Sequence, residues 1–248
     1  MAYHPALSVS NQFTTTQWKV VLEARDGTES QARQALEALC RAYWFPLYAC
    51  VRSRGHDADS ARDLTQGFFA DLLGRNFLET IDRSKGRFRS FLLASLEHFL
   101  SHERDKANAL KQGGGAPPVS LDSADAEDRY RLEPADHETP ELVFERRWGL
   151  TVMERTMERL RGDYDDQTGR FEPLKQCLTG DNPDRYAAIA ATLEMTPAAV
   201  KAAVHRLRQR YGVLLREEIA QTVSNPEEVD EELRHLLGVV RPWQGRTG

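Results

Sequence analysis

The sequence predicts an all-α protein with two small helical domains, the second of the helix-turn-helix type. Three observations support this: apolar residues recur at helical spacing, no stretch alternates apolar and polar residues as a strand does, and a segment rich in glycine, proline and acids interrupts the helical pattern. The 248 residues suffice for two such domains. We expect a helical domain at 13–112, an acidic linker at 113–140, a second helical domain at 141–223, and a tail at 224–248.

Three or four helices are expected in the first domain. A small helix should follow the threonines at 14–16, which suit capping positions. A longer helix is indicated by apolar residues at helical spacing, and Pro46 should kink it near Ala42. Further helices are expected at 57–73 and 85–110. The apolar positions of the helix that contains Pro46 are Leu36, Leu39, Cys40, Tyr43 and Leu47.

The linker combines helix-breaking and acidic residues. It begins with three glycines and two prolines within residues 113–118. From Gly113 to Glu141 there are eight acids and two arginines, so this stretch alone exceeds the net charge of -5 of the whole chain. By contrast, Met195 to Arg216 carries five bases and no acid. Such a basic segment within an acidic protein is typical of a nucleic-acid-binding surface.

The second domain contains a helix-turn-helix pattern. After a helix at 140–160, two more helices are expected at 183–193 and from Pro197 to about residue 219. Only three residues separate the latter two, with Thr196 placed as the N-cap and Pro197 at the first helical position. A structural helical hairpin has the same pattern, so spacing alone leaves both interpretations open.

One face of the helix from Pro197 is suited to DNA. Val200, Val204, Leu207 and Tyr211 share a narrow arc that we expect to be buried. Arg206 and Gln209 on the opposite face can reach base edges, whereas Lys201 and the flanking arginines suit phosphates. The alternative is a solvated basic face. The candidate DNA-contacting residues are Lys201, Ala202, His205, Arg206, Arg208, Gln209 and Arg210.

The helix at 57–73 should expose Asp59, Asp63 and Gln66. The two acids stand four residues apart, and their repulsion costs about 0.2 to 0.5 kcal/mol in an isolated helix. A cationic partner would relieve that repulsion, although Arg62 and solvent are a sufficient alternative. The following loop interleaves bases with aromatic residues, a composition that suits unstacked nucleic acid. Its candidate contacts are Arg75, Asn76, Lys85, Arg87 and Arg89.

Several classes of function lack support in the sequence. His98 and His102 are spaced to bind a metal but have no evident third ligand. The three cysteines form no C-x-x-C pair, and there is neither a nucleophile elbow nor a phosphate-binding glycine loop. We expect a non-enzymatic protein without cofactor or metal. The N-terminus lacks the features of a signal peptide and no apolar run could span a membrane, so we expect a cytoplasmic protein.

The tail at 224–248 contains a short amphipathic helix. Asn225 is placed as its N-cap, Pro226 as its first residue and Glu228 at the third helical position. A helix this short needs a surface for its apolar stripe. Docking on the second domain, where the acids would complement the basic helix, is favoured over docking on a regulatory partner. The stripe consists of Val229, Leu233, Leu236 and Leu237.

Several motifs resemble those of bacterial extracytoplasmic-function sigma factors. Residues 63–69, DLTQGFF, resemble the D-L-x-Q-x-x-F motif of that family, and residues 86–92, GRFRSFL, resemble the pattern that opens the next helix. Residues 186–190 and 199–208 look like the family's DNA-binding domain. The similarity extends from about Phe13 to Ile219, and residues 39–48 and 217–223 look like a subgroup found in planctomycetes and related bacteria.

The resemblance implies a role for each exposed face. The helix at 57–73 would bind core RNA polymerase through Asp59, Asp63, Gln66 and Phe69. The basic loop and the exposed side of the next helix, with His98, Ser101 and Arg104, would meet the melted -10 promoter element. The helix from Pro197 would read the -35 element, and the acidic linker would thread the polymerase channel.

The expected function is therefore that of a sigma factor, whose partners are core RNA polymerase and promoter DNA. An anti-sigma or other regulatory protein is a further partner that the sequence leaves open. Two alternatives remain: a helix-turn-helix regulator that binds DNA without polymerase, and a sigma-like adaptor that binds only protein. The chain also departs from the family, with Glu194 where the turn often has glycine and Phe91 where tryptophan is usual. The promoter sequence therefore cannot be transferred.

Overall fold

The computed structural model describes residues 29–74, 87–110, 127, 130, 138–164, 169–180, 182–223 and 225–240. All regular elements in these ranges are helical, so the all-α class is confirmed there. The order is α2 (Glu29–Ser53), α3 (Ala58–Gly74), α4 (Phe88–Leu110), α6 (Pro140–Asp163), α7 (Phe171–Lys175), α8 (Pro183–Thr192), α9 (Pro197–Ala220), the 3-10 turn η3 (Pro226–Glu228) and α10 (Val229–Val240). The helix expected after residues 14–16, most of the linker, and Arg75, Asn76 and Lys85 lie outside the described residues.

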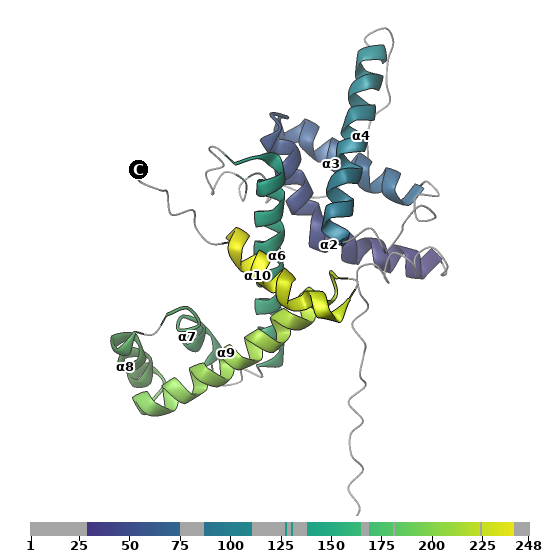
Figure 1. Cartoon of the computed structure of the whole chain (residues 1–248). Helices are drawn as coiled ribbons and strands as arrows, with labels where there is room; N and C mark the ends of the chain where they lie inside the picture. Colours follow the sequence, from purple (N-terminus) through teal and green to yellow (C-terminus); the bar gives the residue numbers. More distant parts are fainter. Residues whose placement is uncertain are drawn as a thin grey trace, which may run out of the picture.

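Helices α2, α3 and α4 lie together (Figure 1), and they share an aromatic core. The Tyr43 ring of α2 meets the edge of Phe88, with 5.4 Å between the ring centroids. Phe68 of α3 meets Phe99 of α4 in the same way at 5.8 Å. Edge-to-face pairs add to the stabilisation from burial. Helix α2 continues through Pro46, and α4 begins at Phe88, later than the predicted start at residue 85.

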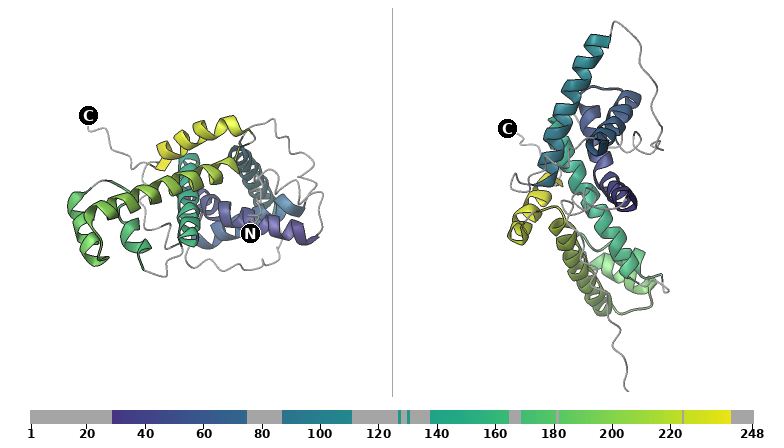
Figure 2. Two further views of the ribbon diagram at one scale, coloured as in Figure 1. Left: turned by 90° about the horizontal axis from the view of Figure 1, so that it is seen from below. Right: turned by 90° about the vertical axis from the view of Figure 1, so that its right-hand side faces the viewer.

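Helix α6 connects the two predicted domains. Its Phe144, Trp148 and Val152 belong to the same buried cluster as α2, α3 and α4. Figures 1 and 2 show α6 between α2 on one side and α9 on the other. Further along, Leu160 of α6 belongs to a second cluster with α7, α8 and most of α9. The boundary between the two clusters therefore falls within α6 and α9.

Helices α8 and α9 are joined by a short turn. The two helices are bent by 104° relative to each other. The Thr196 hydroxyl accepts a hydrogen bond from the Ala199 amide at 3.2 Å, as its N-cap position predicts. Glu194 has a φ of +53°, and the amide of Met195 donates to the Ala190 carbonyl at 2.9 Å. Glu194 thus adopts the left-handed conformation that glycine often provides at a helix end.

The tail docks on the rest of the chain. Leu236 of α10 is fully buried in the first cluster, and Val229 and Leu233 pack against it. Leu237 is 41% exposed, so it lies outside the buried stripe that the sequence predicts. The tail begins with η3, where Asn225 makes no side-chain capping hydrogen bond. Within the described ranges, no single helix is long and apolar enough to cross a membrane, and only the bent pair α8 and α9 would meet that length and composition together.

Candidate nucleic-acid interface

Helix α9 presents the predicted polar face to solvent. Val200, Val204 and Leu207 are at most 3% exposed, which confirms the predicted buried side. Tyr211 is half-buried between the two clusters. Because the apolar side is fixed against α8 and α7, the opposite side faces outward. The exposed candidates on it are Lys201, Ala202, His205, Arg206 and Gln209.

The two flanking arginines of α9 have intramolecular partners. Arg208 donates hydrogen bonds to the carbonyl oxygens of Cys177 at 2.7 Å, Leu178 at 3.2 Å and Gly180 at 2.8 Å. These bonds satisfy the carbonyl groups that follow α7, so Arg208 fixes that turn against α9. Arg210 donates to Asp163 Oδ2 from Nε at 2.9 Å and from Nη2 at 2.5 Å. Exposure of the Arg210 side chain remains at 48%.

A groove of about 800 Å³ lies between α3 and α4. Asp63 of α3 lines it together with Glu103 and Arg104 of α4. Asp59 is exposed but forms an ion pair with Arg62 at 3.0 Å, which is the plain alternative to a polymerase contact. Gln66 is half-buried. Phe69 is only 5% exposed and belongs to the core, so it cannot contact a partner in this arrangement.

The exposed side of α4 contains the remaining candidates for the -10 element. His98, Ser101 and Arg104 are all exposed. The rings of His98 and His102 lie 4.6 Å apart. No group of three or more metal-binding side chains comes together among the residues that the structure describes. The face therefore offers hydrogen-bonding and cationic groups for a polar partner.

Arg89 differs from the prediction, since it is buried. Its Nε lies 2.6 Å from Glu145 Oε2 of α6, and its Nη1 pairs with Glu232 of α10. The guanidinium also stacks over the Trp148 ring, 4.8 Å from the centroid. Only 3% of the Arg89 side chain is exposed. Arg89 therefore holds α4, α6 and α10 together and cannot reach DNA in this arrangement.

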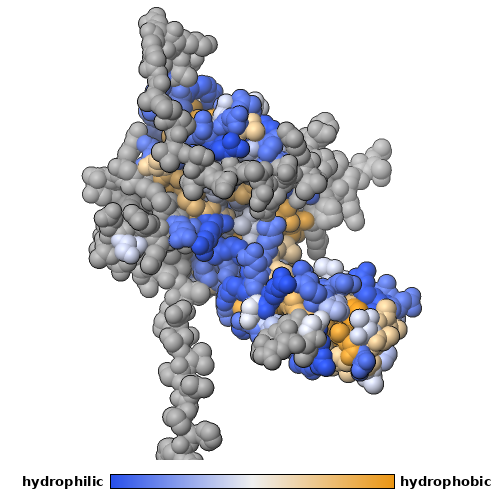
Figure 3. All heavy atoms as spheres, turned by 180° about the vertical axis from the view of Figure 1, so that it is seen from behind, coloured by the Kyte–Doolittle hydropathy of each residue, from blue (hydrophilic) through white to orange (hydrophobic). Residues whose placement is uncertain are grey.

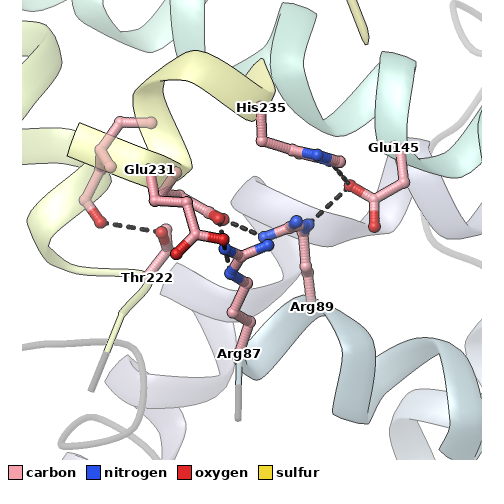
Figure 4. Close-up of polar contacts among 8 residues, drawn as sticks. Arg87, Arg89, Glu145, Thr222, Glu231 and His235 are labelled. Carbon is pink, nitrogen blue, oxygen red and sulfur yellow. Dashed lines mark hydrogen bonds and ion pairs between the residues drawn. The ribbon is translucent and has the colours of Figure 1, made fainter. Parts of the chain in front are cut away.

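Arg87 belongs to the same cluster of charges but lies nearer the surface. Its Nη2 lies 2.7 Å from Glu231 Oε1, and its Nε lies 2.9 Å from Glu232 Oε2. His235 Nε2 approaches Glu145 Oε2 at 2.9 Å on the other side (Figure 4). The Arg87 side chain is 25% exposed. The sequence did not indicate Glu231 and Glu232 as partners of Arg87, because they lie more than 140 residues further along the chain.

Two further ion-pair groups were not predicted. Arg159 of α6 pairs with Glu217 at 2.6 Å and Glu218 at 2.8 Å, which joins α6 to α9. Glu127, from the predicted linker, accepts hydrogen bonds from Arg52 and from the Tyr48 hydroxyl at 2.6 Å. Burial, reinforced by this carboxylate, raises the pKa of Tyr48 to about 12. At least one acid of the linker is thus bound to α2.

Hydrophilic residues cover most of the described surface seen from behind, while apolar residues show at the α7–α8 end (Figure 3). The candidate contacts for nucleic acid and polymerase come from α3, α4 and α9.

No protein-family model, curated protein or solved structure matches this chain.

Replacement of Arg89 tests its structural role. Arg89→Ala should lower the free energy of unfolding by about 3 to 5 kcal/mol, because Glu232 and Glu145 lose their shared cation in a buried site. Urea unfolding followed by circular dichroism measures this change. Arg104→Ala, an exposed position on the same helix, is the control and should stay within about 0.5 kcal/mol of the wild type. Equal losses for the two variants would contradict the structural role of Arg89.

Proposed function

We propose that this chain is a sigma factor that directs core RNA polymerase to promoter DNA. The observation that carries the proposal is the α8–α9 pair. Its second helix exposes Lys201, His205 and Arg206 on one side while its apolar side is buried. A helix presented in this way fits the major groove of duplex DNA, where side chains near its start meet base edges.

The exposed groups of α9 divide into two kinds of contact. Arg206 and Gln209 are long enough to form paired hydrogen bonds with base edges. Lys201 supplies a point charge for a phosphate. The partly exposed Arg210 can add a phosphate contact if it exchanges Asp163 for DNA. Arg208 supports the site indirectly, because it fixes the turn between α7 and α8.

Support for a polymerase partner comes from the other end of the molecule. Asp63 is exposed and lines the same groove as Arg104. In the proposed complex, Asp63 meets a basic surface of polymerase while Arg104 faces melted DNA. A polymerase-independent helix-turn-helix regulator is the second candidate, since α8 and α9 alone would suffice for it. The α3 acids have no role in that alternative.

Reconstitution with bacterial core RNA polymerase separates the two candidates. The chain should co-purify with core polymerase and support run-off transcription. Asp63→Lys should abolish both activities without loss of thermal stability, because the side chain is exposed. Asp105→Lys makes the same charge change at an exposed position of α4 and should leave binding intact. DNA binding without polymerase binding would select the independent regulator, and loss of folding in Asp63→Lys would make Asp63 structural.

The α9 assignments are tested on a promoter identified by sequencing the transcript starts of that reaction. Arg206→Ala should weaken holoenzyme binding to this promoter by about 1 to 3 kcal/mol, with relaxed specificity at one base pair. Lys201→Ala should instead weaken all sequences alike and reduce the slope of log affinity against log salt by about 0.9. Binding that is unchanged in both variants would show that this face of α9 does not contact DNA.

A further inference from the structure

The acids at the start of α10 lie on basic residues from two distant parts of the chain. Glu231 pairs with Arg87 at 2.7 Å. Asp230 pairs with Arg216 near the end of α9. Figure 2 shows α10 beside the end of α9, and Figure 4 shows Glu231 directed at Arg87. Two cations that the sequence assigns to basic, nucleic-acid-binding segments are thus neutralised by one short helix.

These two arginines differ from Arg89 in their accessibility. The Arg87 side chain is 25% exposed and that of Arg216 is 54% exposed, whereas Arg89 is buried between α6 and α10. Partly exposed ion pairs contribute only about 0 to 1 kcal/mol each. Detachment of α10 also separates the buried Glu232 from Arg87 and Arg89, but Arg89 keeps Glu145 of α6 as its partner. A phosphate backbone can then replace the carboxylates of α10 as the partners of Arg87 and Arg216.

The contacts of α10 fix its position on the rest of the chain and still allow the helix to detach. Leu236 is fully buried, and the helix approaches α6 closely at Gly149, where an added Cβ would lie 2.7 Å from Val240. The helix has only 12 residues, too few for stability without the surface beneath it. Terminal helices of this kind can detach without unfolding of the remaining core.

We propose that α10 is an autoinhibitory segment whose carboxylates occupy a nucleic-acid-binding surface formed by Arg87 and Arg216. Nucleic acid and α10 compete for the same two cations. The inference rests on the proposed function, since it assumes that these arginines face DNA when the protein is active. It adds the regulatory step: α10 must leave before the start of α4 and the end of α9 can contact phosphates.

The test compares DNA binding of the bare chain with and without α10. Fluorescence anisotropy follows binding to a labelled single-stranded oligonucleotide of mixed sequence over a series of salt concentrations. Truncation after Val223 should tighten binding about three- to tenfold and steepen the salt slope by about 1.4, the value for two additional phosphate contacts on a single strand. Arg87→Ala in the truncated chain should remove about half of that extra slope, but should change little in the full chain.

A point variant covers the case in which the truncated chain does not fold. Glu231→Gln in the full chain should tighten binding by a smaller factor, because Arg87 loses its exposed partner. Glu227→Gln removes the same charge at an exposed position of η3 and should have no such effect. Equal gains in both point variants would show a long-range charge effect and overturn the proposal, as would unchanged affinity and slope in a folded truncated chain.

The outcome for α10 is separable from that for the sigma role. Tighter DNA binding after truncation, in a chain that fails to bind core polymerase, supports autoinhibition and rejects the sigma assignment. Polymerase binding and transcription by both chains, with identical DNA affinity and salt slope, rejects autoinhibition alone.

Discussion

The burial of the Arg89 guanidinium is the constraint on which the arrangement of the helices depends. A cation with 3% of its side chain exposed is tolerated only when carboxylates surround it. Those carboxylates come from Glu145 on α6 and Glu232 on α10, and the Trp148 ring covers the guanidinium at 4.8 Å. Glu145 stays beside Arg89 when α10 detaches, whereas a separation of α4 from α6 removes it. The beginning of α4 therefore fixes where α6 lies and provides the site where α10 docks.

This constraint links surfaces that are far apart in the sequence. Helix α6 contributes Phe144 and Trp148 to one core and Leu160 to the other. It therefore fixes the α8–α9 pair relative to the α3–α4 groove. The ion pairs of Arg159 with Glu217 and Glu218 continue the connection into α9. In the proposed function, this connection would keep the polymerase-binding and DNA-binding surfaces in a fixed relative position.

The sequence predicted local features well because their causes are local. Thr196, Pro197 and the apolar arc of α9 specify a capped helix with a defined buried side, and the structure has both. The partners of Arg87, Arg89 and Arg208 could not be predicted, because each depends on residues brought close only by tertiary packing. The acids of the tail were expected to complement α9, as Asp230 does at Arg216, but helical projection did not indicate that α10 would also cover Arg87. The role of every exposed candidate remains a prediction.

The direct test of this arrangement is to cut the chain between its predicted domains without removing any helix. A specific protease site inserted within Gly113–Gly115 would leave α2, α3 and α4 on one fragment and α6 to α10 on the other. Size-exclusion chromatography of the cut protein under native conditions is the measurement. If Arg89 and the shared core join the two parts, the fragments will elute together at the position of the uncut chain. Elution as two separate folded fragments would contradict a shared core and restore two independent domains.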